Sequence, residues 1–243
     1  MSSFEGSVAI VTGSARGIGA AIAGELRARG AGVLGVDVLP HKGLDTTVVG
    51  DLREEATVER CFAEAGELPG TLRVLVNSAF WEERGLLLET SQEGWEQTLA
   101  VSLGCTWRMI RAFAPRAGAD AAIVNLASVH SFGAVAGFAP YEAAKAAIVA
   151  LTRSAAVELG PRGIRCNAVA PGFVAVERNR AIWEDESKLQ AVLRAYPLGR
   201  PGRPEDVAKC VAFLASSESA FVTGSVLRVD GGMSAQLAEA MVR

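Results

Sequence analysis

Few residues in this sequence could bind a metal ion. The 243 residues include two histidines and four cysteines. The cysteines are widely spaced, with no C-x-x-C pair and no histidine beside them: Cys61, Cys105, Cys166 and Cys210. Zinc sites need cysteine and histidine ligands at close, regular spacing. We therefore expect no metal site, and we interpret the cysteines as buried, reduced thiols.

The sequence also lacks a large excess of charge and a long hydrophobic run. Its formal net charge is −3, which argues against nucleic acid or an anionic membrane as a partner. No apolar run approaches the ~18 residues of a membrane-spanning helix. The first residues lack the basic segment of a secretory signal. We expect a cytoplasmic protein without a membrane partner.

Linkers, repeats and low-complexity segments are missing as well, so nothing divides the chain. A length of 243 residues, of which 50% are hydrophobic and 26 are glycine, suits one α/β domain over residues 1–243. Short apolar runs alternate with helical patterns, which predicts buried parallel strands joined by helices. The predicted strands are residues 8–12, 32–37, 46–50, 72–77, 121–125 and 164–169.

A glycine-rich turn lies between the first predicted strand and a helix, with the spacing G-x-x-x-G-x-G. Gly13 permits the tight turn, Gly17 lets the backbone approach a pyrophosphate, and Gly19 allows close packing of the helix. The first N–H groups of the helix would face the phosphates. Strand, turn, helix and second strand are typical of a dinucleotide-binding half. No Gly-Lys-Ser or Gly-Lys-Thr follows, which disfavours a P-loop.

Two residues bear on the choice between NAD and NADP. Asp37 ends the second predicted strand, where a carboxylate binds the ribose hydroxyls of adenosine and repels a 2′-phosphate. Arg16 lies in the glycine turn, and its guanidinium could bind that phosphate instead. We give Asp37 more weight, because it lies directly at the strand end, and we expect NAD.

Glycines and polar residues follow the predicted strands. Ligands of parallel sheets bind at the carboxyl ends of the strands, so these residues should share one rim. They are Gly13, Asp37, Asp51, Asn77, Ser128 and Pro171-Gly172. We therefore expect a binding site at this rim. Asp51 could also cap the helix that follows it.

A tyrosine and a lysine open the alanine-rich run that reaches Gly160. Tyr141 and Lys145 are four residues apart, so in a helix they share one face. An ammonium beside a phenol favours the phenolate and lowers the pKa of the tyrosine. The pair is a candidate acid/base centre.

Several motifs occur together along nearly the whole chain. They are Thr12 to Gly19, Asp37, Asp51-Leu52, Asn77-Ser78-Ala79, Ser128, Tyr141-x-x-x-Lys145, Asn167, Pro171-Gly172, Phe221 to Gly224 and Val229 to Gly232. With these motifs the sequence resembles the short-chain dehydrogenase/reductase family. The resemblance implies a single doubly wound Rossmann-type α/β domain. It also implies a mostly parallel seven-stranded sheet, helices on both faces and a nicotinamide cofactor across the rim.

The resemblance implies a role for each central residue. Tyr141 would be the acid/base on the substrate hydroxyl, and Ser128 would orient the substrate oxygen. Lys145 would hold the nicotinamide ribose and depress the pKa of Tyr141. The implied cofactor contacts are Gly13, Ser14, Arg16, Gly17, Ile18, Gly19, Asp37, Asp51, Leu52, Asn77, Ala79, Tyr141, Lys145, Pro171, Gly172 and Val174.

Three positions depart from the family pattern. Phe80 replaces a glycine beside the cofactor, and with Trp81 it could narrow the substrate mouth or pack on a helix. Ser102 replaces the fourth catalytic residue, an asparagine; we expect it to hold a water in a proton relay to Lys145. Val176 replaces a threonine that bonds the carboxamide, which weakens the expected grip on the cofactor.

Two further segments suggest a substrate cover and an assembly. Residues from about 175 to 203 contain a short amphipathic pattern, and the resemblance suggests a lid over the substrate. His130 lies near the reacting centre if the resemblance holds, and could contact a hydroxyl or a carboxylate of the substrate. Residues 143–159 are apolar nearly all round, which suggests a homo-oligomer. The family makes a tetramer the expected form.

The leading functional prediction is an NAD-dependent oxidoreductase that interconverts a secondary alcohol and a ketone. A sugar, a polyol, a hydroxy acid or a cyclic alcohol would fit as substrate. The alternative is an NADP-dependent 3-oxoacyl reductase, favoured by Arg16 and opposed by Asp37. A nucleotide-sensing protein without catalysis is disfavoured, because such proteins usually lack the tyrosine or the lysine, and Tyr141 and Lys145 are both present.

Overall fold

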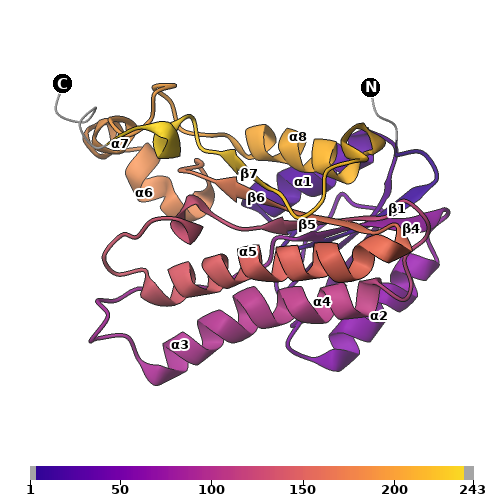
Figure 1. Ribbon diagram of the computed structural model, residues 1–243. Helices are drawn as coiled ribbons and strands as arrows, with labels where there is room; N and C mark the ends of the chain where they lie inside the picture. Colours follow the sequence, from indigo (N-terminus) through magenta and orange to yellow (C-terminus); the bar gives the residue numbers. More distant parts are fainter. Residues whose placement is uncertain (1–3, 238–243) are drawn as a thin grey trace.

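The computed structural model describes residues 4–237 as one α/β domain around a seven-stranded sheet (Figure 1). The strand order is β3-β2-β1-β4-β5-β6-β7, and each described pairing is parallel. The strands are β1 (Ser7–Thr12), β2 (Gly32–Asp37), β3 (Thr46–Val49), β4 (Thr71–Asn77), β5 (Ala122–Leu126), β6 (Arg165–Pro171) and β7 (Val226–Val229). The predicted doubly wound, seven-stranded architecture is confirmed. The predicted strand at residues 32–37 has the observed ends, and the other five predicted strands differ from the observed ones by one or two residues at their ends.

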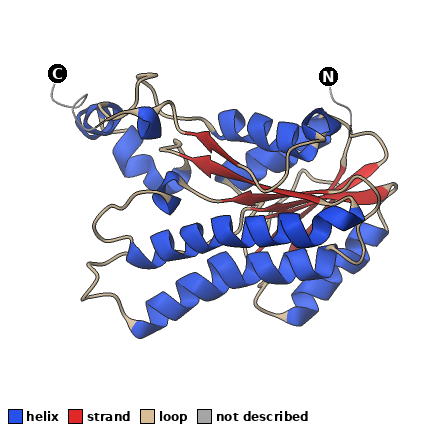
Figure 2. Cartoon of the chain, viewed as in Figure 1, coloured by secondary structure: helices blue, strands red, loops and turns tan. Residues whose placement is uncertain are grey.

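Helices cover both faces of the sheet (Figure 2). They are α1 (Gly17–Ala28), α2 (Glu55–Gly66), α3 (Gln92–Leu99), α4 (Cys105–Phe113), α5 (Ala139–Leu159), α6 (Arg180–Trp183), α7 (Glu186–Leu193) and α8 (Pro204–Ala215). A π-helical turn, η1 (Ala100–Gly104), joins α3 to α4. α8 begins at Pro204, a position where proline gives up no hydrogen bond within the helix.

The core lies in two layers on either side of the sheet, because successive strand residues point to opposite faces. In β1, Val8 and Ile10 pack with α2 and α4 on one face. Ala9 and Val11 pack with α1 and α8 on the other face. β1 is buried along its whole length, as expected of a parallel strand with helices on both sides.

The chain changes direction at β1, and this places the site. It runs outward from β1 through β2 to β3, and then returns to β4 on the other side of β1. The helices of the two halves therefore leave the rim in opposite directions at β1 and β4, which opens a crevice at the carboxyl ends of these strands. In residues 4–237, no helix combines the length and the apolar character needed to cross a membrane.

Candidate active site

The glycine loop after β1 has a backbone that favours glycine. Gly13 (φ +68°) and Gly17 (φ +57°) lie in the left-handed region. A Cβ at Gly13 would lie 2.9 Å from the backbone of Ala79, and a Cβ at Gly19 would lie 2.0 Å from the Gly13 carbonyl oxygen. The loop thus packs against the exit of β4 and the start of α1, in agreement with the turn and packing roles predicted for Gly13 and Gly19.

The first turn of α1 has backbone donors to offer. Its N-cap residue, Arg16, makes no side-chain hydrogen bond to that turn, so the first N–H groups of the helix have no side-chain cap. Uncapped N–H groups at a helix N-terminus, together with the helix dipole, bind phosphate groups. The loop and the first turn of α1 therefore fit the pyrophosphate of a dinucleotide.

Asp37 lies against the glycine loop at the end of β2. Its Oδ2 accepts a hydrogen bond from the Ala15 N–H at 3.0 Å, and its Oδ1 accepts one from the Leu39 N–H at 3.0 Å. The carboxylate is held at the place where an adenosine ribose would lie. The side chain of Arg16 is exposed and makes no hydrogen bond among the described residues.

Ser14 has a partner that the sequence did not predict. Its hydroxyl lies 2.8 Å from Nε2 of His41, in the loop between β2 and β3. A Cβ at Gly35 would lie 2.5 Å from this hydroxyl and 2.7 Å from the His41 ring, so a glycine in β2 makes room for the contact. A cofactor that uses the Ser14 hydroxyl must share it with His41.

Asp51 does not cap α2, contrary to one of the roles considered for it. The N-cap of α2 is Glu54, and the Asp51 carboxylate instead accepts hydrogen bonds from the backbone and the guanidinium of Arg53. The guanidinium of Arg53 lowers the pKa of Asp51. The next residue, Leu52, is buried in the core, and its predicted contact with the cofactor stays a prediction.

The exits of β1 and β4 are joined by hydrogen bonds. Oγ1 of Thr12 accepts from the N–H groups of Ser78 and Ala79 at 2.9 and 3.0 Å. Asn77 donates through Nδ2 to Oδ1 of Asn125 at 2.8 Å. Its own Oδ1 is buried and has no partner among the described residues. A buried oxygen with no donor can still accept a hydrogen bond from a ligand.

Three predicted catalytic residues meet at the carboxyl end of β5. Ser128 follows β5, and the first turns of α5 present Tyr141 and Lys145. Lys145 Nζ lies 5.6 Å from the centre of the Tyr141 ring and donates to the Leu126 carbonyl oxygen at 2.6 Å. The Ser128 hydroxyl lies near enough to the Tyr141 phenol to lower its pKa. The structure therefore brings together the hydroxyl, the phenol and the amine.

The protonation of this group differs from the prediction. Burial raises the pKa of Tyr141, and the Ser128 hydroxyl and the guanidiniums of Arg178 and Arg84 oppose this rise. Burial, with the nearby charge of Arg178, lowers the pKa of Lys145 from 10.5 to about 7. In the protein chain by itself the pKa of Tyr141 is therefore raised and not lowered, because burial of the phenol outweighs the groups that lower its pKa. The effect of Lys145 on the pKa of Tyr141 beside a bound cofactor stays a prediction.

Ser102 lies in the π-helical turn and is fully buried. Its hydroxyl donates to the Trp81 carbonyl oxygen at 2.8 Å and accepts from the Trp81 N–H at 3.2 Å. The donor is thus committed to the loop that leaves β4. The relay role of Ser102 stays a prediction, and it would depend on the second lone pair of the hydroxyl.

Aromatic rings surround Tyr141. Phe80, His130 and Phe138 have ring centres 6.0, 5.6 and 6.4 Å from that of Tyr141. Phe80 is 39% exposed, and its ring packs against Tyr141 and Lys145 of α5. His130 is also within reach of the reacting centre, and its Nδ1 lies 3.1 Å from Glu142 Oε1. The contact of His130 with substrate stays a prediction.

The loop after Pro171-Gly172 is tied to the predicted lid. Val174 is buried in the core. The backbone of Val176 accepts from the Trp183 indole at 2.8 Å and donates to Asn179 Oδ1 at 3.0 Å. The predicted amphipathic segment forms the short helices α6 and α7, which lie at one end of the domain (Figure 1). Whether this segment moves stays a prediction.

A cluster of three charged side chains beside Tyr141 was missed. Glu82 Oε1 accepts from Arg84 at 2.7 Å and from Arg178 of the lid. The three residues are 82, 84 and 178, so no local pattern joins them. The only signal in the sequence was the departure at Phe80, which marks this loop as unusual.

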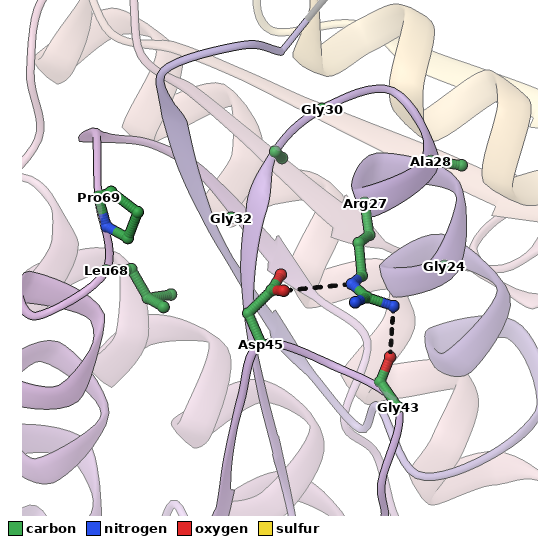
Figure 3. A pocket seen from close by; sticks show the side chains of 10 residues that line it. Gly24, Arg27, Ala28, Gly30, Gly32, Gly43, Asp45, Leu68 and Pro69 are labelled. Carbon is green, nitrogen blue, oxygen red and sulfur yellow. Dashed lines mark hydrogen bonds and ion pairs between the residues drawn. The ribbon is translucent and has the colours of Figure 1, made fainter.

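A cavity of about 640 Å³ lies far from these residues (Figure 3). It is between the end of α1, the start of β2 and the turn before β4, at the opposite edge of the sheet from the site. Its one acidic residue, Asp45, is satisfied by Arg27 and by the Val33 N–H. None of the described lining residues has a buried side-chain nitrogen or oxygen without a hydrogen-bond partner, so the rim is the better candidate.

Comparison with known proteins shows the family to which the chain is similar. A family model described as enoyl-acyl-carrier-protein reductase matches residues 13–234. The 3-oxoacyl-acyl-carrier-protein reductase FabG of Escherichia coli is 36% identical over 245 residues, which cover 95% of this chain and 98% of that protein. The human dehydrogenase/reductase SDR family member 4 is 34% identical and covers 95% of this chain, with 88% of its own length matched.

Solved structures agree with these relatives. The aldohexose dehydrogenase of Thermoplasma acidophilum, in ligand-free form, has a TM-score of 0.89 at 31% identity, covering 97% of this chain and 96% of that one. A protein of Agrobacterium tumefaciens assigned as a 2-deoxy-D-gluconate 3-dehydrogenase, with bound NADP, has a TM-score of 0.88 at 32% identity. It covers 96% of this chain and 98% of that one.

Proposed function

Because the chain belongs to the short-chain dehydrogenase/reductase family, whose oxidoreductases use a nicotinamide cofactor, we propose that it is an NAD-dependent dehydrogenase acting on a secondary alcohol or ketone. The observation that carries the proposal is the meeting of Ser128, Tyr141 and Lys145 at the rim, next to a glycine loop that fits a pyrophosphate. A binding protein without catalysis would not need to keep these three groups together.

Each of the three residues has a part in the proposed reaction. Ser128 hydrogen-bonds the substrate oxygen and turns it toward Tyr141. Tyr141 takes the hydroxyl proton when the alcohol is oxidised and returns a proton when the ketone is reduced. Lys145, fixed by the Leu126 carbonyl oxygen, lies where it can bind ribose hydroxyls. A bound nicotinamide supplies the hydride chemistry.

The preference for NAD depends on Asp37. Its carboxylate is held by two backbone N–H groups at the end of β2, and a fixed negative charge at that place repels a 2′-phosphate. Arg16 is free to turn toward such a phosphate, but its long side chain loses more entropy on being fixed. Asp37 is already in place.

A second candidate is an NADP-dependent 3-oxoacyl reductase. It is favoured by the 36% identity to FabG over nearly the full length of both proteins, and by the exposed Arg16 in the glycine loop. Both candidates use Ser128, Tyr141 and Lys145. They differ in the dinucleotide and in the compound that enters under the lid.

One experiment separates the two candidates. Purified protein is assayed with a panel of sugars, polyols, hydroxy acids, cyclic alcohols and 3-oxoacyl thioesters, with NAD or NADP and their reduced forms. Absorbance of the reduced nicotinamide is the readout. The proposal expects higher kcat/KM with NAD than with NADP, and expects Asp37→Ala to narrow the difference. Better activity with NADP and a 3-oxoacyl thioester would establish the second candidate instead.

A homo-oligomer, with a tetramer as the expected form, remains part of the proposal. On α5, the outer face exposes Ala146, Ala150 and Val157, and α4 beside it exposes Trp107. Arg153 interrupts this face, so it is less apolar than the sequence suggested. Light scattering of the purified protein tests whether it forms an oligomer. The cytoplasmic location also stays a prediction.

A further inference from the structure

The charged cluster beside Tyr141 has one feature that a structural ion pair does not require. Two guanidiniums, of Arg84 and Arg178, share the single oxygen Oε1 of Glu82. The other oxygen, Oε2, is buried and has no hydrogen-bond partner among the described residues. An ion pair that only fastened the lid would be more stable with a donor on each oxygen. With two guanidiniums and one carboxylate, the cluster itself carries one positive charge that Glu82 does not neutralise.

The surplus charge lies close to the reacting centre. The Arg178 guanidinium is 4.8 Å from the Phe80 ring, and the Arg84 guanidinium is 4.8 Å from the Phe138 ring. Both rings pack edge-on against Tyr141. Each guanidinium is thus one aromatic ring away from the phenol. The charge of Arg178 also acts on the pKa values of Tyr141 and of Lys145, which agrees with this proximity.

None of the other carboxylates near the site pairs with Arg84 or Arg178 among the described residues. Glu142 is occupied by His130 and by the Val135 N–H. In the lid, Glu177 and Glu184 both pair with Arg180.

Both guanidiniums of the cluster keep donors for a ligand. The side chains of Arg84 and Arg178 are 52% and 39% exposed. Arg178 uses one nitrogen, Nη1, on Glu82, and its remaining N–H groups make no hydrogen bond among the described residues.

From this arrangement, and resting on the proposed function, we propose that the substrate carries a carboxylate a few bonds from its carbinol carbon, and that Arg178 with Arg84 binds this carboxylate. A guanidinium binds a carboxylate with two parallel hydrogen bonds, which fixes direction as well as distance. The substrate is thus a hydroxy acid and its oxo acid. Since Arg178 belongs to the lid and Glu82 to the loop after β4, the bound carboxylate also holds these two segments together.

The test compares acids with neutral partners of the same shape. Oxidation of 3-hydroxybutyrate is measured against its methyl ester, and oxidation of gluconate against sorbitol. If the inference is correct, the unmodified protein oxidises each acid with a higher kcat/KM than its neutral partner. Arg178→Met should lower kcat/KM for the acid on the order of 10- to 100-fold, the usual effect of losing a charged hydrogen bond. The kcat/KM of the same variant for the ester should change less than about threefold. Arg180→Met, in the same lid, is the matched control and should leave both unchanged.

A second variant moves the charge in the opposite direction. Glu82→Gln keeps the shape of the side chain and makes the cluster more positive. The inference expects a lower KM for the acid and no gain for the ester. If Glu82 only fastens the lid, KM should rise for acid and ester alike, and the inference fails. Equal activity of the parent on acid and ester would also overturn it, while leaving the dehydrogenase proposal intact.

Binding without turnover separates this inference from the proposed function. Malonate, which cannot be oxidised at a carbinol, is titrated by calorimetry into the protein with NAD present. Binding that Arg178→Met weakens and Arg180→Met preserves supports the carboxylate site even if no alcohol in the panel is oxidised. Equal malonate binding by all three proteins overturns the inference. Thermal unfolding of each variant verifies that the fold is kept.

Discussion

The two halves of the rim are built in different ways. In the half formed by β1, α1 and β2, the site is a backbone shape: left-handed glycines, uncapped N–H groups and a carboxylate held by main-chain donors. In the half formed by β5, α5 and the lid, the site is a set of side chains that depend on one another for position and charge. The first half has little room for a new atom, and the second has little tolerance for a changed charge.

The two halves also differ in whether neighbouring or distant residues specify their geometry and charge. A glycine turn is specified by a few neighbouring residues, because φ and Cβ clashes are set within one segment. The charge state of Tyr141 is specified by burial and by partners from Ser128 to Arg178, which are far apart in sequence. Mutations in the two halves should therefore fail in different ways.

The largest effect is expected in the second half, with Tyr141→Phe. This variant keeps the ring and its packing but removes the proton carrier, so kcat should fall about 10²–10⁴-fold. Dinucleotide binding should be nearly unchanged in a fluorescence titration. In the parent, oxidation should become faster with rising pH, because the phenolate accepts the proton and burial raises the pKa of Tyr141. A Tyr141→Phe protein with more than a tenth of the parent activity would contradict the role of the phenol.

The second-largest effect is expected from a substitution in the half formed by β1, α1 and β2. In Gly19→Ala the new Cβ would lie 2.0 Å from the Gly13 carbonyl oxygen, so the loop must shift. We expect dinucleotide affinity to fall at least about tenfold, with a loss of roughly 1–3 kcal/mol in the free energy of unfolding. Gly24→Ala is the matched control in the same helix, because its Cβ would meet no atom within 4 Å. It should be neutral or slightly stabilising. Equal behaviour of the two variants would refute the packing role of Gly19.

A third variant, Lys145→Met, separates stability from function in the second half. The pKa of Lys145 is about 7 in the fold and 10.5 in the unfolded chain. The unfolded chain therefore binds more protons, and this residue destabilises the fold fully below about pH 7 and hardly at all near pH 10.5.

Lys145→Met removes that destabilisation but leaves the Leu126 carbonyl oxygen unpaired. We expect a net gain of roughly 1–3 kcal/mol at pH 7 that disappears toward pH 10.5, together with loss of turnover. Thermal unfolding at the two pH values gives the answer. If the variant is less stable than the unmodified protein at pH 7, burial in the fold does not disfavour the charged form of Lys145 as proposed.

The smallest effect concerns Ser102. Replacing it with alanine leaves the Trp81 N–H and carbonyl oxygen unpaired, which costs about 1–3 kcal/mol and loosens the loop after β4. If the hydroxyl only positions Trp81, Ser102→Ala should raise KM and leave the shape of the pH–rate profile unchanged. If it also holds a relay water, the profile should shift, and Ser102→Asn should restore it. The two outcomes decide between a positioning role and a relay.

The strands, the glycine turn and the convergence of Ser128, Tyr141 and Lys145 could be predicted, because each follows from periodicity or from a short motif. The role of Asp51 as a helix cap was wrong, since the preference for a nearby guanidinium decided its contacts. The pKa shift of Tyr141 was wrong in sign, because helical spacing says nothing about desolvation. The partner of Ser102 and the cluster of Glu82 with two arginines were not accessible from local patterns at all.

By itself the sequence determined the order of strands and helices, the shape of the glycine loop and the position of Tyr141 one turn from Lys145 on the same helix face. These depend on local geometry: strand period, left-handed glycines and the four-residue spacing of a helix. Only the tertiary structure decided how Tyr141 and Lys145 are charged, which group Ser102 holds, and that Arg178 reaches Glu82. Burial and long-range charge pairs arise when distant segments pack together, and no local stretch of the chain contains that information.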